Sequence, residues 1–337
     1  MAKPSLLRDR REFLTLLGGG AAAWPLVARA RQPEQARRIG VLTPWSEHDP
    51  VPKIWLSAFA RGLAELGWNE GRNLRLDVRW AAGNPDWVRM YAKELVELQP
   101  DAILVDSTPQ TAALQSETGT IPIVFVVVSD PVGSGFVAGL PRPGGNLTGF
   151  SNQEPSMGGK WVELLLEIAP HLRRVAAMFD PAAAPYLRSY YLPPFEAAAR
   201  LLKVEPVVVP VHSDTEIETA ITSLGRESGG LVVMPDAFLT AHRDSIISLA
   251  IRNNVPAVNQ ASYFTREGLL LSYGPDFTDL YRRAATYIDR ILRGAKPSEL
   301  PVQLPVKFEM AVNVKTAREL GLTVPPSIVL RVDEMIE

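Results

Sequence analysis

Hydrophobic and polar positions change their period repeatedly along the chain from Arg38 onward. Short runs rich in β-branched and aliphatic residues predict buried strands at 38–43, 74–80, 102–105 and 122–128. The longer amphipathic stretches between them predict helices at 55–66, 86–98 and 110–116. Strands that alternate with helices of this length are typical of βαβ units, so this part predicts a parallel sheet with helices on both faces.

A cluster of breaking residues at 141–146 interrupts the pattern and leads into a short run at 147–151, which we interpret as the first crossing between two lobes. The alternation then restarts, with strands predicted at 174–179, 205–211, 230–234 and 255–258. Helices are predicted beside them at 157–168, 186–202, 215–224 and 238–252. Further crossings are expected near 269–274 and between 301 and 312, with helices at 276–292 and 314–320.

The two series predict two Rossmann-like α/β lobes with parallel sheets, joined by a three-crossing hinge around a cleft. We expect the first lobe to comprise residues 37–150 and about 276–305, and the second 151–275 and about 306–337. Helix 276–292 has no strand partner of its own unless it returns to the first sheet. The assignment of the C-terminal segment, with its last helix, stays open.

Residues 1–30 have the three-part plan of a secretory signal peptide: a basic front, an apolar middle and a small-residue end at Ala28-Arg-Ala30. Arg10 and Arg11, followed by Phe13-Leu14, resemble the twin-arginine export signature. A membrane anchor or a buried helix is the alternative, but the apolar run falls short of the ~20 residues that span a bilayer. We therefore expect cleavage after Ala30, export to a periplasm and no membrane insertion afterwards.

The composition of the chain excludes several classes of protein and of site. The chain has 337 residues, of which 46% are hydrophobic, which suffices for two sizeable cores and excludes extensive disorder. The formal charge of -2 lacks the basic field of nucleic-acid-binding proteins. Five basic and two acidic side chains lie in residues 1–30, so removing them changes -2 to -5. The absence of cysteine excludes disulfides, thiolate metal sites, cysteine nucleophiles and a lipid-modified N-terminal cysteine.

Ligands of open parallel sheets bind where the strands end, so the turns after the predicted strands are the candidate site. In the first lobe the candidate ligand-binding residues are Thr43, Trp45, Ser46, Ser107, Thr108, Gln110, Ser129 and Asp130. In the second lobe they are Phe179, Asp180, Asp236, Ser262 and Tyr263. No metal ligand, cofactor or catalytic residue is proposed.

The polar candidates suggest a charged ligand. Ser107 and Thr108 can present hydroxyls and helix N-terminal amides to a carboxylate, or they can simply cap a helix. Asp236 and Asp130 are candidates for a cationic group, although Asp236 can equally serve as a cap and an Asp-Pro pair such as 130–131 is first of all a turn signal.

Aromatic candidates suggest an apolar ligand body. Trp45, Phe238 and Tyr263 can sandwich such a body, and the alternative for each ring is packing in the core. The glycine-rich stretch at 133–145 lacks the spacing of a dinucleotide fingerprint. The four histidines stand far apart in the sequence, so neither a metal site nor a catalytic triad is supported.

Several motifs match one known family. They are Arg38-Ile-Gly-Val-Leu42, Phe59 with Gly62-Leu63 and Leu66-Gly67, Asn73, Ile121-Pro-Ile-Val124, Ser129-Asp-Pro-Val132, Leu140-Pro-Arg-Pro-Gly-Gly-Asn-Leu-Thr-Gly149, Val312-Asn-Val-Lys-Thr-Ala317 and Leu320-Gly-Leu322. With them, residues 37–337 resemble the ABC-transporter substrate-binding proteins of the tryptophan/tyrosine-uptake type, within the type I periplasmic binding proteins.

The resemblance implies a bilobed fold with three crossings, a small ligand held between the lobes and delivery to an ABC permease in the inner membrane. It implies ligands such as aromatic amino acids, bound at Ser107-Thr108, Ser129-Asp130, Asp236 and Ser262-Tyr263. Many members are anchored by a lipidated cysteine, which this chain lacks, so we expect it to diffuse freely. We also expect a monomer.

The leading hypothesis is therefore a periplasmic solute-binding protein without chemistry of its own, which closes on its ligand. Two alternatives stay open. One is an exported two-lobed enzyme, such as a racemase or transferase, that uses cleft carboxylates. The other is a sensor module that presents its closed form to a membrane receptor.

Overall fold

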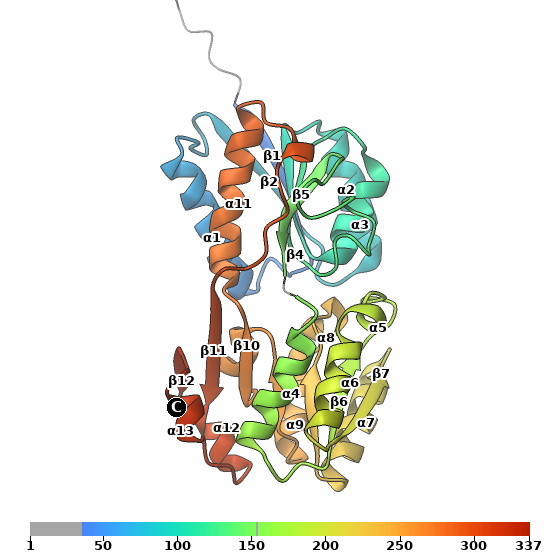
Figure 1. Cartoon of the computed structure of the whole chain (residues 1–337). Coiled ribbons are helices and arrows are strands. Elements are labelled where there is room, and N and C mark those ends of the chain that lie inside the picture. Colours follow the sequence, from blue (N-terminus) through green and yellow to red (C-terminus); the bar gives the residue numbers. More distant parts are fainter. Residues whose placement is uncertain (1–35, 153) are drawn as a thin grey trace, which may run out of the picture. The chain divides into compact units, whose positions relative to one another are not determined.

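The computed structural model describes residues 36–152 and 154–337, and the predicted signal peptide lies outside them. Two separate sheets organise these residues, one in each lobe (Figure 1). The first has the strand order β2-β1-β3-β4-β5, and all of its pairings are parallel. Its strands are β1 (Arg37–Thr43), β2 (Leu74–Trp80), β3 (Ala102–Asp106), β4 (Ile123–Val128) and β5 (Leu147–Ser151).

Helices cover both faces of the first sheet. One face carries α1 and α11, which pack against each other, and the other carries α2 and α3 (Figure 1). Their bounds are α1 (Pro50–Glu65), α2 (Pro85–Glu97), α3 (Thr108–Glu117) and α11 (Phe277–Leu292). Helix α11 thus returns from the second series to the first sheet.

The α1–α11 contact requires a glycine. An added Cβ at Gly62 would lie 2.9 Å from the Cβ of Ala285 and 3.1 Å from the carbonyl oxygen of Arg282. The two helices therefore approach so closely at this point that a larger residue would require a shift, and they form the part of the first lobe that carries Trp55 and Phe277.

The second sheet has the order β12-β11-β10-β9-β8-β6-β7. Its strands are β6 (Arg174–Phe179), β7 (Glu205–Pro210), β8 (Gly229–Val233), β9 (Ala257–Asn259), β10 (Leu271–Pro275), β11 (Phe308–Asn313) and β12 (Glu334–Ile336). Only the β10–β11 pairing is antiparallel among those described, so both sheets are mostly parallel, as predicted.

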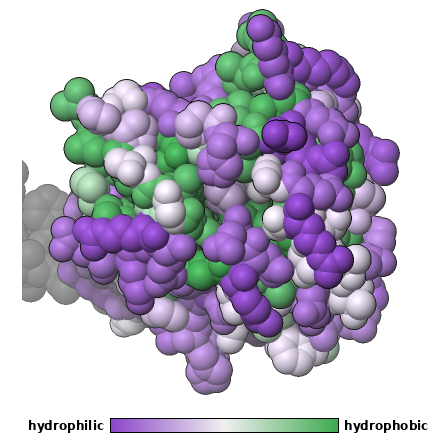
Figure 2. Space-filling model, turned by 90° about the horizontal axis from the view of Figure 1, so that it is seen from below, coloured by the Kyte–Doolittle hydropathy of each residue, from purple (hydrophilic) through white to green (hydrophobic). Residues whose placement is uncertain are grey.

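Nine helices belong to the described part of the second lobe. They are α4 (Met157–Ile168), α5 (Leu187–Tyr190), α6 (Leu192–Leu201), α7 (Asp214–Arg226), α8 (Ala237–Ala241), α9 (Arg243–Arg252), α10 (Ser262–Arg266), α12 (Val314–Glu319) and α13 (Pro326–Val329). Figure 2 views this lobe from below and shows hydrophobic groups interspersed among hydrophilic ones, as on most folded proteins. Within residues 36–152 and 154–337, every helix is too short or too polar to cross a bilayer.

Three segments connect the lobes: the chain after β5, the junction of β10 with α11, and residues 301–307 before β11. They are hydrogen-bonded to one another, because Ser151 N donates to Gln303 O (2.8 Å) and Asp276 N donates to Lys307 O (3.0 Å). The first crossing starts later than the sequence pattern suggested. The run 147–151 is itself strand β5 of the first sheet, so the breaking cluster at 141–146 lies inside the first lobe.

Two predicted helices are each broken in two. The helix predicted over 186–202 is α5 followed by α6, and Pro193 and Pro194 open α6, where missing amide donors cost least. The helix predicted over 238–252 is α8 followed by α9, with His242 at the junction. Helices α10 and α13 and strand β12 were not predicted, since each is five residues or shorter.

Candidate ligand-binding site

A cavity of about 200 Å³ lies between the lobes, where the carboxyl ends of strands from both sheets face each other. Loops after β1, β3 and β4 line it from the first lobe, and segments after β8 and β9 line it from the second. Asn152, in the first crossing, also lines it. Because Asn152 belongs to one of the three crossings that form the hinge, the cavity lies beside the hinge.

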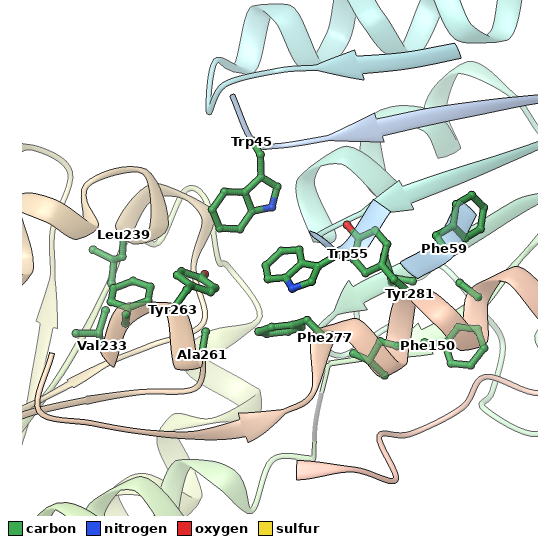
Figure 3. Packing of buried hydrophobic residues seen from close by; sticks show 14 of the residues in the cluster. Trp45, Trp55, Phe59, Phe150, Val233, Leu239, Ala261, Tyr263, Phe277 and Tyr281 are labelled. Atoms are coloured by element: carbon green, nitrogen blue, oxygen red, sulfur yellow. The ribbon is translucent and has the colours of Figure 1, made fainter. Parts of the chain in front are cut away.

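One side of the cavity is an aromatic wall, formed by Trp45, Trp55, Tyr263 and Phe277. Figure 3 shows these rings grouped between the lobes, with Tyr263 from α10 meeting the rings of the first lobe. The ring centroids lie 5.4 Å apart for Trp45–Trp55 and for Trp45–Tyr263, and 5.1 Å apart for Trp55–Phe277. All four side chains are buried, so the wall joins the two lobes through edge-to-face and tilted ring contacts.

The carboxyl group of Asp106, the last residue of β3, anchors this wall from the first lobe. Its Oδ2 accepts hydrogen bonds from Trp45 Nε1 (3.1 Å) and from the Tyr281 hydroxyl (2.8 Å). Burial raises the pKa of Asp106 to about 6, although hydrogen bonds from Tyr281, Trp45 and Thr43 oppose the rise. Asp106 is thus a cavity-lining acid that neutral donors hold in place.

The second lobe contributes the carboxyl group of Asp236, at the start of α8. Its Oδ1 accepts from the backbone amides of Phe238 (2.6 Å) and Leu239 (3.2 Å), and its Oδ2 accepts from the amide of Asp180 (2.5 Å). Burial raises the pKa of Asp236 to about 7, with these amides opposing the rise and the nearby Asp180 carboxylate adding to it. Asp236 therefore caps α8 and lines the cavity at once.

Strained backbone borders the cavity at the ends of β3 and β4. Ser107 has φ +81° and ψ 156°, and Val127 has φ +56°, conformations that side-chain-bearing residues rarely adopt. The Ser107 side chain does not cap α3, so it does not accept a hydrogen bond from the amides in the first turn of this helix. The amide of Ser129 donates to Thr108 Oγ1 (3.3 Å), which ties the two loops together.

An ion pair links the lobes next to the aromatic wall. Arg243 of α9 contacts Asp49 at the start of α1 (Nη2–Oδ2, 2.8 Å) and Glu267 after α10 (Nε–Oε2, 2.7 Å). Its guanidinium also lies over the rings of Trp45 and Tyr263, at 5.7 and 6.0 Å from their centroids. The pair is largely shielded, since the exposed fractions of the Arg243 and Asp49 side chains are 17% and 8%.

Two amide side chains meet at the hinge. Asn152 Nδ2 donates to Gln260 Oε1 (2.7 Å), which joins the first crossing to the segment after β9. Asn152 Oδ1 is buried and has no hydrogen-bond partner among the described residues. Tyr186 completes this side of the cavity, because its hydroxyl donates to the carbonyl of Pro235 (2.8 Å).

A family model for ABC transporter substrate binding proteins matches residues 38–336. The chain belongs to this family. The protein has the type I periplasmic binding fold, because it has two α/β lobes with mostly parallel sheets and is similar in structure to solved binding proteins.

Two solved structures and one curated relative are similar to this substrate-binding protein. A conserved domain protein from Vibrio cholerae has a TM-score of 0.82 at 27% identity and covers 89% of this chain and 100% of that one. An ABC domain in complex with L-Trp from Streptococcus pneumonia has a TM-score of 0.82 at 26% identity and covers 90% and 100%. A tyrosine-binding protein from Clostridioides difficile is 24% identical over 276 residues, 82% of this chain and 79% of the relative.

In this substrate-binding protein, seven residues predicted from the sequence line the cavity together: Trp45, Ser46, Ser107, Thr108, Ser129, Asp236 and Tyr263. Six others lie outside the lining: Thr43, Gln110, Asp130, Phe179, Asp180 and Ser262.

The six excluded side chains serve the site indirectly or serve the fold. Asp130 bonds the amide of Gly133 within its own turn (2.8 Å), Phe179 is in the core of the second lobe, and Ser262 donates to Glu309 (2.5 Å). The Thr43 side chain hydrogen-bonds Asp106, the amide of Asp180 donates to Asp236, and Gln110 is buried in α3.

Eight other lining residues were given no ligand-binding role from the sequence, although Asp106 and Gln260 belong to turns that follow predicted strands. The eight are Asp49, Trp55, Asp106, Asn152, Tyr186, Arg243, Gln260 and Phe277. One signal was available: Asp49 precedes Pro50, the pattern of a helix start, and it would have extended the first predicted helix to the cavity.

Proposed function

We propose that this protein is the exported substrate-binding component of an ABC importer, and that it captures one small amine-bearing organic molecule, such as an aromatic amino acid, between its lobes. The observation that carries the proposal is the interlobe cavity, which combines an aromatic wall with one buried carboxyl group from each lobe. The tryptophan and the tyrosine named for the two relatives have a body and an amine that suit these groups.

The cavity has distinct places for the parts of such a ligand. Trp45 and Tyr263 offer ring surface to an apolar body. Asp236 offers a carboxyl oxygen to the amine from the second lobe. Ser107 and Thr108, at the start of α3, offer hydroxyls and backbone amides to an oxygen of the ligand.

Closure of the lobes accounts for capture and release. The Asp49–Arg243 pair and the Asn152–Gln260 hydrogen bond both link the lobes and both involve cavity-lining residues. A ligand that contacts both lobes would stabilise the closed arrangement, and opening at the three crossings would release it. The closed arrangement is the form that a permease would recognise.

A binding screen tests this proposal. The chain from Arg31 onward would be screened by thermal shift with the twenty amino acids and with small amines, and positives would be measured by calorimetry. We expect at least one saturable ligand with one site per chain. The proposal fails if nothing binds, or if the protein converts a tested compound into a product.

Two tryptophan variants locate the bound ligand. Trp45→Ala removes a ring of the aromatic wall and is expected to weaken binding at least tenfold. Trp87→Ala is the matched control, because Trp87 is 44% exposed on α2 and lies outside the cavity lining. Equal loss in both variants would place the ligand elsewhere.

A further inference from the structure

The charges that line the cavity are unbalanced. The lining includes three carboxyl groups, from Asp49, Asp106 and Asp236, and one guanidinium, from Arg243. Arg243 is already paired, with Asp49 and with Glu267. Among the described residues, neither Asp106 nor Asp236 forms an ion pair, so each lobe brings one carboxyl group to the cavity without a cation of its own.

Neutral donors alone hold these two groups. Asp106 accepts from an indole and a phenol, and Asp236 accepts from three backbone amides. Such donors orient a carboxylate and satisfy part of its hydrogen-bonding capacity, but they supply no formal positive charge. Burial raises the pKa of both acids, which is the expected consequence of carboxyl groups in this setting.

A third polar side chain lies beside the same space. Asn152 lines the cavity, its Nδ2 donates to Gln260, and its Oδ1 is buried with no hydrogen-bond partner among the described residues. A primary ammonium has three N–H donors and no acceptor, which matches a cavity with carboxyl oxygens on Asp106 and Asp236. A ligand carboxylate has only acceptors and cannot donate a hydrogen bond to either group.

The aromatic wall and the residue before helix α3 also favour a cationic ligand. The Arg243 guanidinium already lies over the Trp45 and Tyr263 rings, so these rings are used as cation-binding faces in this fold. The amino end of α3 would by itself favour an anion, but Asp106 stands two residues before the helix and places a carboxyl group there.

We propose that the cavity selects ligands with net positive charge, namely small organic amines without a balancing carboxylate, over zwitterionic amino acids with the same body. The inference rests on the proposed function, since it concerns the same cavity, and it narrows the ligand class. A ligand carboxylate would share the enclosed space with Asp106 and Asp236, and like charges in a shielded site repel strongly.

Matched ligand pairs test the inference on the chain from Arg31 onward. Calorimetry at pH 7.5 would compare tryptamine with tryptophan, tyramine with tyrosine, phenethylamine with phenylalanine and agmatine with arginine. We expect at least one amine to bind ten or more times tighter than its amino acid, and N-acetylation of that amine to abolish binding. If amino acids bind as tightly as amines or tighter, this inference is wrong while the proposed function stands. If no compound of either class binds, both are wrong.

Charge-removing variants provide a second, independent measurement. Asp106→Asn keeps an oxygen that can accept from Trp45 and Tyr281, and Asp236→Asn removes the charge from the other lobe. Each is expected to lower the amine-to-amino-acid affinity ratio at least tenfold. Asp86→Asn, at an 81% exposed side chain, is the control and should keep the ratio of the native protein. An unchanged ratio in both cavity variants would overturn the inference.

Discussion

The carboxyl group of Asp106 should make stability depend on pH in a way that one substitution removes. Asp106 is buried, and the groups that face it are the Tyr281 hydroxyl, the Trp45 indole, the Thr43 hydroxyl and, at longer range, Tyr263. No cation is among them. Its pKa is raised from the ordinary 3.8 to about 6, chiefly because burial disfavours the charged form.

The size and the sign of the effect follow from this rise. The folded protein holds the Asp106 proton more tightly than the unfolded chain does, so ionisation with rising pH costs the folded state. The free energy of unfolding should fall by about 3 kcal/mol from this group as the pH passes from below 3.8 to above 6. About 2 kcal/mol of that loss falls between pH 4.5 and pH 8.

Asp106→Asn removes the titration and keeps an acceptor for the two donors. We expect its free energy of unfolding, minus that of the native protein, to rise by about 2 kcal/mol between pH 4.5 and pH 8. Urea unfolding followed by tryptophan fluorescence across this range measures the difference.

Tyr281→Phe provides the complementary comparison. It leaves the carboxyl group in place and removes a hydrogen bond that lowers its pKa, so the loss of stability should extend to higher pH. A pH-independent difference between Asp106→Asn and the native protein would refute the reasoning. So would a Tyr281→Phe profile that moves to lower pH.

Three further outcomes are expected. Asp49→Asn keeps the capping oxygen of α1 and breaks the ion pair with Arg243, so it should destabilise the closed arrangement by about 1–2 kcal/mol. Small-angle scattering of the ligand-free variant should then give a larger radius of gyration than that of the native protein. Ser107→Gly should raise the free energy of unfolding by about 1 kcal/mol, because glycine adopts this backbone conformation without strain. Calorimetry of the same variant should give weaker ligand binding, because the loop becomes more flexible. Gly62→Ala should lower the free energy of unfolding by about 1–3 kcal/mol in urea titrations, since its Cβ would collide with Ala285; an unchanged midpoint would show that α1 can move away.

Much of the fold could be predicted from the sequence because its strands are buried on both faces. Such strands read as continuous β-branched and aliphatic runs, and β3 and β4 are nearly uniform in this respect. Two lobes with mostly parallel sheets followed correctly from that alternation. The strand β12 and the helices α10 and α13 are too short to establish a period, so local pattern could not reveal them.

The site was predictable only as far as the strand-end rule reaches. That rule identifies loops, and it correctly placed Trp45 and Asp236 at the cavity. It carries no information on residues that helices bring to the cleft, such as Trp55 and Arg243, because their direction depends on how the helices pack. Asp106 lies in a turn that the rule identifies, but its role could not be predicted, because its burial at the end of β3 and its hydrogen bonds depend on the folded structure.

The cavity concentrates features that are unfavourable to the ligand-free fold. Ser107 and Val127 have backbone conformations that cost free energy, and Asp106 and Asp236 are buried acids without a cationic partner among the described residues. The proposed cationic ligand would relieve the electrostatic part of this cost, and the strained loops are already in place to receive it. The same groups that reduce the stability of the empty protein should therefore increase its affinity. Substitutions at these positions should change stability and binding in opposite directions, whereas substitutions in the α1–α11 contact should reduce stability without affecting ligand choice.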